Sequence, residues 1–328
     1  MKEENNNLLE KNNIGFNYGN IFRSLGIIVI TILVAIGISL LSPYFFTTKN
    51  ILNIIRQSSF LCLLSMGQTI VIITRGIDLS VSSTISISGC VAAYFTILLD
   101  GNIAVAFIIG ILAGGIIGII NALLINVGKM EPFLATLSTM IIGSGALLYV
   151  TGGVPIVPYV NSFTTLGRGY IGWLPIPIII VIIIAFILDN ITSNTVFGKH
   201  IYAVGGNPNA ARVSGINVER SIASAYIISG LLAGSAGVLL ASRLSSGQPS
   251  AGTGMELMSV CAAVVGGASF FGGEGTIYGT VSGVLLIGII GNGLNLLNIS
   301  SFLHQVVIGT ILIFAIIIDR YIKRRGVS

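Results

Sequence analysis

The stretch IAVAFIIGILAGGIIGIINALLINV, residues 103–127, contains no charged side chain and is long enough to cross a lipid bilayer as a helix. Similar apolar runs lie on both sides of it, separated by short breaks rich in Gly, Pro or polar residues. The sequence therefore predicts an all-α polytopic membrane protein. The ten expected spans are 24–41, 51–74, 79–99, 103–127, 133–151, 174–188, 221–243, 256–270, 276–297 and 301–319. Two of them, 174–188 and 256–270, are short for a full crossing.

Charge is scarce along the whole chain. Of 328 residues, only 16 are Lys or Arg and 11 are Asp or Glu, whereas a soluble protein of this length would carry roughly 80 charged residues. Hydrophobic residues make up 54% of the chain. This composition excludes a soluble globular protein, and it excludes a disordered chain, which needs few apolar residues and much charge.

The basic residues divide unevenly between the two sides of this topology. With the N-terminus inside, twelve Lys or Arg residues lie on the inner side and four on the outer side. Because basic residues concentrate in cytoplasmic segments, we expect both termini in the cytoplasm. The expected organisation is a tail at 1–23, a transmembrane domain at 24–319 and a basic tail at 320–328. The net charge of +5 then reflects orientation and gives no reason to expect a nucleic-acid partner.

The sequence carries no pattern for enzyme chemistry. Gly128–Lys129 and Gly198–Lys199 both lack the Ser or Thr that completes a phosphate-binding loop, so we expect no ATP bound by such a loop. No cluster of Cys and His predicts a metal site. We expect a non-catalytic chain without a metal or cofactor of its own.

The carboxylates all fall in tails, in loops or at the ends of the expected spans. Ion-coupled transporters commonly place a carboxylate deep in the membrane, where it marks the coupling site. The distribution of carboxylates in this chain therefore disfavours ion-coupled secondary transport. That class stays open as an alternative, since some sodium sites use backbone carbonyls and hydroxyls.

The segment ITRGIDLSVSS, residues 73–83, joins the second and third spans. Gly76 permits a tight turn, and Asp78 and Ser80 can accept hydrogen bonds from the free N–H groups that begin the next helix. Arg75 lies beside them on the inner side. We expect these four residues to form a cytoplasmic turn motif, and a capped turn without a functional role is the alternative.

The segment AVGGNPNAARVSGI, residues 203–216, lies in the largest inner loop, 189–220. Asn207 suits an N-cap, Pro208 the first helical position and Gly215 the C-terminal cap. The helix between these caps would be under two turns, too short to be stable alone in water. It must therefore be held by its flanking loop or by a partner, unless it merely connects two spans.

Glycine-rich segments flank the short span at 256–270. They are RLSSGQPSAGTGMEL, residues 243–257, in which Glu256 can cap the span, and VVGGASFFGGEGTIYG, residues 264–279. A short span between such segments is typical of a broken or half-crossing helix near a translocation path. Close packing of helices on glycine explains the pattern equally well.

Several uncharged polar residues lie within the expected spans. They can line a path for a hydroxyl-rich solute, or they can hydrogen-bond one helix to another, which is common in membrane bundles. The candidates for the path are Gln57, Gln68, Asn121, Asn292 and Asn295.

Six motifs between about residue 50 and residue 320 carry a resemblance to a known family. They are GIDLSV (76–81), GKMEPFLATL (128–137), AVGGNPNAARVSGI (203–216), RLSSGQPSAGTG (243–254), VVGGASFFGGEGT (264–276) and GNGLNLLNISS (291–301). In this order they resemble the permease subunits of bacterial ATP-binding-cassette (ABC) importers for monosaccharides, most closely the ribose type. Arg75 and Ser82 stand where this family more usually has Gly.

The resemblance implies a fold similar to the type II, cobalamin-importer permeases, with about ten helices, in the cell membrane and in contact with its lipid. It implies two permease subunits, expected to be a homodimer, above ATPase subunits that hold ATP and Mg²⁺. It also implies an extracytoplasmic binding protein that delivers the sugar, with ribose as the leading candidate. The alternatives are an ion-coupled sugar transporter and a membrane scaffold without a transport path.

The resemblance also assigns roles to two of the segments. The short helix of the inner loop corresponds to the coupling region that docks into the ATPase, which assigns coupling to Asn207, Pro208, Asn209, Ala210, Ala211, Arg212 and Gly215. The outer loop that follows the seventh span becomes a candidate docking surface for the binding protein. Its residues are Ser246, Gly247, Gln248, Pro249, Gly252 and Gly254.

Overall fold

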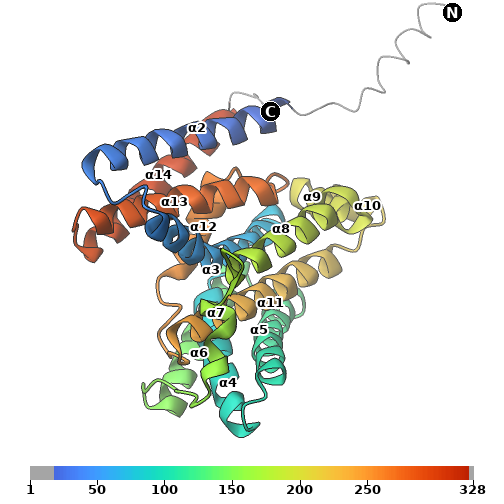
Figure 1. Cartoon of the computed structure of the whole chain (residues 1–328). Helices are drawn as coiled ribbons and strands as arrows, with labels where there is room; N and C mark the ends of the chain where they lie inside the picture. The colour runs from blue at the N-terminus through green and yellow to red at the C-terminus, as the bar shows by residue number, and fades with distance from the viewer. Residues whose placement is uncertain (1–17, 325–328) are drawn as a thin grey trace, which may run out of the picture.

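The computed structural model describes residues 18–324, which fold into a bundle of α-helices (Figure 1). Residues 1–17 and 325–328, and with them most of the predicted N-terminal tail and the end of the basic tail, lie outside the described residues. The elements are α2 (Tyr18–Leu41), α3 (Thr48–Ile73), α4 (Val81–Leu98), α5 (Ile103–Asn126), α6 (Pro132–Thr151), η2 (Asn161–Thr164), α7 (Thr165–Arg168), β1 (Tyr170–Ile171), β2 (Leu174–Pro175), α8 (Ile176–Asn194), α9 (Val196–Gly206), α10 (Pro208–Val213), α11 (Val218–Leu244), α12 (Met255–Val265), α13 (Ile277–Leu296) and α14 (Ser301–Arg324).

Each of the ten predicted spans corresponds to one helix, which confirms the all-α polytopic fold class. Within the described part of the chain, six helices are long and apolar enough to cross a membrane by themselves, namely α4, α5, α6, α8, α11 and α13. Shorter apolar segments, Gly26–Leu41, Met255–Val265 and Gln305–Ile317, lie in α2, α12 and α14.

Two predicted boundaries were wrong. The helix expected at 174–188 continues to Asn194 and has 19 residues, so α8 is not short and the first part of the predicted inner loop is helical. The helix expected at 256–270 ends at Val265 and has only 11 residues, because Gly267 turns the chain with a φ of +97°. At a rise of 1.5 Å per residue α12 is about 16 Å long, roughly half of the hydrocarbon thickness, a length that suits the predicted half-crossing helix.

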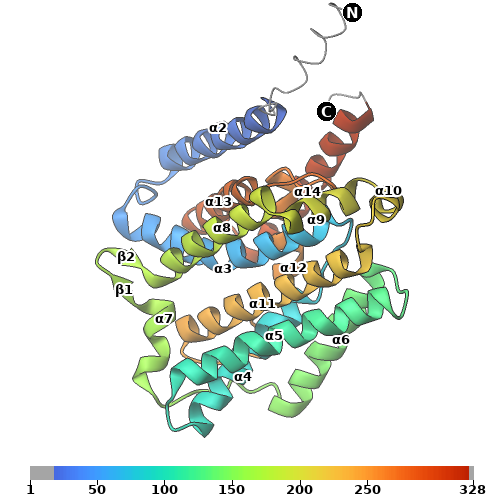
Figure 2. The same cartoon turned by 90° about the vertical axis from the view of Figure 1, so that its right-hand side faces the viewer.

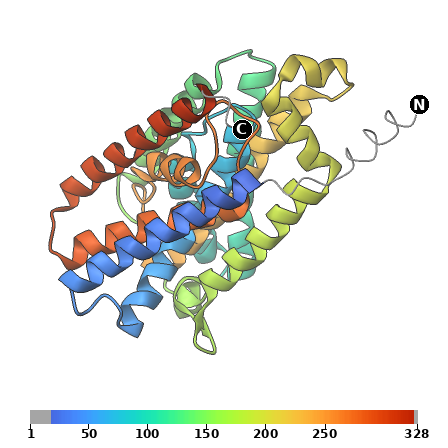
Figure 3. The ribbon, with the colours of Figure 1, turned by 90° about the horizontal axis from the view of Figure 1, so that it is seen from above.

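Figure 2 shows α3, α5, α8 and α11 running roughly alongside one another between two ends of the bundle. One end carries α9 and α10, and we call it the α10 end. The opposite end carries α7 and the ribbon formed by β1 and β2, in which Tyr170 pairs with Pro175, and we call it the α7 end. Seen from above, α2 lies along α13 with α14 beside them (Figure 3).

The central helix α11 packs on α5 through backbone contact at glycines. Gly114 and Gly118 of α5 face Gly230 and Gly234 of α11, so both helices carry glycines four residues apart at their contact. A Cβ atom on Gly230 would overlap the carbonyl oxygen of Gly114, and one on Gly114 would overlap that of Gly230. Small residues are the usual means of close helix packing in membranes, where apolar side chains gain little by leaving lipid.

We expect Gly230→Ala to lower the free energy of unfolding by about 1–3 kcal/mol, because the added methyl forces α5 and α11 apart. The thermal unfolding midpoint of the purified protein in detergent measures this loss. Gly145→Ala in α6 is the matched control, since a Cβ there meets nothing within 4 Å. Equal midpoints for the two variants would contradict the proposed backbone contact.

Candidate functional site

The turn between α3 and α4 carries a carboxylate into the interior of the bundle. Asp78 is only 1% exposed. Its Oδ1 accepts hydrogen bonds from the backbone N–H of Ser80 at 3.0 Å and from the Ser80 hydroxyl at 2.6 Å. Its Oδ2 accepts one from the Ser229 hydroxyl of α11 at 2.8 Å. A buried carboxylate needs such donors because it has lost its water shell.

The hydrogen bonds around Asp78 continue to three further helices, and we call the bonded residues the Asp78 cluster. They are Asp78, Ser80, Ser229, Asn121, Thr139 and Gln68. The Ser80 hydroxyl accepts a hydrogen bond from Asn121 Nδ2 of α5 at 2.7 Å, and Asn121 Oδ1 accepts one from Thr139 Oγ1 of α6 at 2.7 Å. The side-chain amide of Gln68 in α3 accepts a hydrogen bond from the backbone N–H of Asp78 and donates one to its backbone carbonyl, each at 3.1 Å. The Asp78 cluster therefore ties together α3, α4, α5, α6 and α11.

Two expectations about this turn need correction. Ser80 occupies the N-cap position of α4 but makes no cap hydrogen bond, because its hydroxyl is engaged by Asp78 and Asn121. The Asp78 carboxylate also lies within the bundle, although the sequence pattern placed every carboxylate at its edges. Its partner Ser229 is about 16 Å along α11 from the start of that helix. The position of the carboxylates is thus no argument against ion-coupled transport.

We expect Asp78→Asn to lower the free energy of unfolding by about 1–3 kcal/mol, since the Asn amide nitrogen cannot accept the hydrogen bonds that one carboxyl oxygen now accepts. The thermal midpoint of the purified protein measures the change. Asp100→Asn is the matched control, because Asp100 is exposed and Asn tolerates its positive φ of +48°. A drop no larger than that of the control would show that the Asp78 cluster contributes little.

Arg75, in the same turn, holds the C-terminal end of α9. Its Nε donates to the carbonyl of Gly205 at 2.6 Å, and a second guanidinium N–H donates to the carbonyl of Gly206. A cation at this position also suits the negative end of the helix dipole. A Cβ on Gly205 would overlap the carbonyl of Ile73, so glycine is needed for this approach.

A third segment joins this contact from the connection between α12 and α13. The N–H of Gly273 donates to the carbonyl of Ile73 at 2.9 Å, and the Tyr202 hydroxyl of α9 donates to the carbonyl of Gly275 at 2.7 Å. Burial, with a smaller effect of the Asp189 charge, raises the pKa of the Tyr202 phenol to about 12, so it stays a donor at physiological pH. The structure thus brings together at the α10 end three segments that the sequence gave no reason to pair.

Helix α10 is closed by caps at both ends, as predicted. The Asn207 side chain accepts from the N–H groups of Asn209 at 3.0 Å and Ala210 at 3.1 Å. At the other end, Gly215 has a φ of +83° and its N–H donates to the carbonyl of Arg212, while the N–H of Ile216 donates to that of Ala211. This double hydrogen bond is the Schellman arrangement.

One face of α10 is held by the protein and the other is free. Ala211 is buried against Val204 and Val218. Arg212 forms an ion pair with Glu219 of α11 at 2.7 Å. Val213, by contrast, is 90% exposed at the end of the helix. The flanking segments therefore supply the support that so short a helix needs, and its outer face is exposed.

The predicted docking surface at 246–254 is wrong for most of its residues. Ser246, Gly247, Pro249 and Gly252 are buried, while Gln248 and Gly254 are half-buried. The loop does not stand out at the surface. It pairs with residue 156 through Gly247 and then runs inward along α4. The N–H of Gly252 donates to the Ser86 hydroxyl of α4 at 3.1 Å, and a Cβ on Gly252 would overlap the carbonyl of Ser82.

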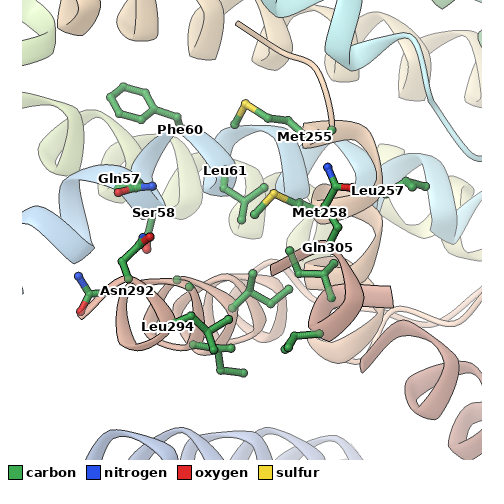
Figure 4. Close-up of a pocket in the computed structure, with 18 of the residues that line it drawn as sticks. Gln57, Ser58, Phe60, Leu61, Met255, Leu257, Met258, Asn292, Leu294 and Gln305 are labelled. Atoms are coloured by element: carbon green, nitrogen blue, oxygen red, sulfur yellow. The ribbon is translucent and has the colours of Figure 1, made fainter. Parts of the chain in front are cut away.

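A cavity of about 710 Å³ lies between α3, α11, α12, α13 and α14 (Figure 4). Of the five candidates for the path, Gln57, Asn292 and Asn295 line it, and Asn292 also exchanges hydrogen bonds of 2.8 and 2.9 Å with Asn50. Gln68 and Asn121 do not line the cavity. They lie in the Asp78 cluster and hydrogen-bond one helix to another, which was the alternative interpretation.

The cavity also contains polar residues that sequence reasoning missed or placed differently. Ser58 and Arg243 line it, and the only signal for them was their polarity within apolar runs. Glu256 lines it too, although it was expected to cap α12. Gly254 is the N-cap of that helix, and the Glu256 side chain makes no cap hydrogen bond.

Comparison with known proteins assigns the chain to a family. A permease family described as "Branched-chain amino acid transport system / permease component" matches residues 50–316, and the chain belongs to this family of multi-pass membrane proteins. No solved structure shows a significant match.

Three relatives are similar over nearly their whole length. The chain is 42% identical over 305 residues to the ribose import permease protein RbsC of Bacillus subtilis, covering 92% of this chain and 94% of that protein. It is 40% identical over 302 residues to the ribose import permease of Haemophilus influenzae, covering 90% and 92%. It is 39% identical over 307 residues to the D-allose transport system permease protein AlsC of Escherichia coli, covering 94% and 92%.

Proposed function

We propose that this chain is the permease subunit of an ABC importer for a monosaccharide, with ribose as the leading candidate. The observation that carries the proposal is the 42% identity to a ribose import permease over 92% of the chain. The family description names branched-chain amino acids, but relatives aligned over 92–94% of the chain are named as ribose, allose and galactose permeases. The latter similarity is the more specific guide to the substrate.

In this proposal the α10 end faces the cytoplasm and α10 is the coupling helix. Its caps make it rigid, and its exposed Val213 presents an apolar contact to an ATPase subunit. ATP and Mg²⁺ are held by that subunit, two copies of this chain form the membrane pathway, and an extracytoplasmic binding protein delivers the sugar at the α7 end.

The contacts behind α10 give it a means of moving the membrane helices. Displacement of α10 moves the end of α9, which Arg75 and Tyr202 join to the turn before α4 and to the connection before α13. The cavity among α3, α11, α12, α13 and α14 then opens to one side or the other, and it is the proposed section of the sugar path.

A direct test is Val213→Asp, which places a charge on the exposed end of α10 without removing an internal contact. In proteoliposomes that contain the complete transporter, we expect at least a tenfold loss of ATP-dependent D-ribose uptake and a loss of ATPase assembly. Val127→Asp is the matched control, because Val127 is 75% exposed and follows α5 directly. Unchanged uptake and assembly for Val213→Asp would reject α10 as the coupling helix.

Ion-coupled secondary transport is the second candidate, and the buried Asp78 carboxylate is the observation that favours it. It predicts D-ribose uptake by the chain alone in proteoliposomes, driven by a proton or sodium gradient and abolished by an ionophore. The ABC proposal predicts no uptake under these conditions until ATPase, binding protein and ATP are present.

A further inference from the structure

The cavity among α3, α11, α12, α13 and α14 contains polar atoms that the protein leaves without partners. Among the described residues, neither Ser58 Oγ nor Glu256 Oε2 has a hydrogen-bond partner, and both atoms are shielded from solvent. Ser58 itself is only 5% exposed. Leaving a buried polar group unpaired costs about 1–3 kcal/mol, so a group of this kind in a cavity indicates a ligand that pairs with it.

Ser58 has room because the facing residue is a glycine. Gly288 of α13 lies opposite, also lines the cavity, and a Cβ there would overlap Ser58 Oγ. Glu256 approaches from the first turn of α12, the half-crossing helix. A hydroxyl-bearing and a carboxylate-bearing residue from two different elements therefore line one space of about 710 Å³, a volume large enough for a small solute.

The surrounding residues indicate the chemistry of that solute. Gln57, Asn295 and Gln305 are exposed and line the cavity, so it opens to the surface of the chain. Each amide both donates and accepts hydrogen bonds, as do the hydroxyls of a sugar. A carboxylate only accepts, and it can pair with two neighbouring hydroxyl groups.

Within the described residues, Arg243 is the basic side chain that lines the cavity. The Arg243 guanidinium lies 5.5 Å from the ring centre of Phe60, and its Nη2 is 3.4 Å from Asn53 Oδ1. The other polar lining groups are amides, the Ser58 and Thr253 hydroxyls and the Glu256 carboxylate, from α3, α12, α13, α14 and the loop before α12. Uncharged hydrogen-bonding groups outnumber the two charged ones, which suits a neutral polyhydroxylated solute.

We propose that Ser58 and Glu256 form a sugar-binding subsite in this cavity, so that the permease itself contacts the solute on its way through the membrane. The proposal rests on the proposed function and adds to it a site within this chain, separate from the binding protein.

The test measures binding of radiolabelled D-ribose to the full-length chain in lipid nanodiscs, without the binding protein. We expect saturable binding, weakened about fivefold or more by Ser58→Ala and by Glu256→Gln, the loss for one hydrogen bond. Ser65→Ala is the matched control. Ser65 lies on the same helix, is buried and also lacks a hydrogen-bond partner, but it does not line the cavity.

Several results would overturn the subsite. The first is the absence of saturable D-ribose binding, which is expected if the cavity holds a lipid chain. The second is an equal effect of Ser58→Ala and Ser65→Ala on binding. The third is tighter binding of L-leucine than of D-ribose. If Glu256→Gln fails to fold, Ser58→Ala decides alone. ATP-dependent uptake by the complete wild-type transporter is measured in parallel. Uptake without binding to the chain rejects only the subsite, whereas binding without ATP-dependent uptake rejects the proposed function.

Discussion

The buried carboxylate of Asp78 is the constraint on which the arrangement of the helices depends. A carboxyl group in an apolar interior needs hydrogen-bond partners from the protein, because no water is available to solvate it. Ser80, the N-cap of α4, and Ser229 of α11 donate to the carboxylate, and Gln68 of α3 holds the backbone of the same residue. The turn before α4 must therefore enter the bundle, and α4, with 18 residues, starts inside it. Any helix that shifts would leave the carboxylate with fewer donors.

That turn also connects the interior to the surface helix α10. Three residues before Asp78, Arg75 binds the carbonyl of Gly205 at the end of α9, which leads directly into α10. One short segment is thus held from inside by a carboxylate and from outside by a guanidinium. A second non-helical segment, which contains Gly252, meets the start of α4 at Ser82. The two interruptions of the helices lie together, as expected for helices broken around a transport path.

The caps of α10 could be predicted from sequence because they are local. Asn207, Pro208 and Gly215 lie within nine residues, and the hydrogen bonds of Asn207 and Gly215 go to backbone only a few residues away. The exposure of the segment at 246–254 could not be predicted in this way. The family resemblance suggested a docking surface there, but the glycines permit close approach, and at Gly252 that approach is to the backbone of α4. Only the packing partner distinguishes the two uses.

The sequence by itself determined the all-α membrane fold, the approximate places of its long apolar helices and the short length of α12, because apolar length and glycine breaks act locally along the chain. The tertiary structure decided which polar residues face one another. Gln57 and Gln68 look alike in sequence, yet one lines the cavity and the other bonds the backbone of Asp78. The reason is physical: inside a membrane bundle a polar side chain must find a partner, and that partner lies on another helix, whose position the local sequence does not specify.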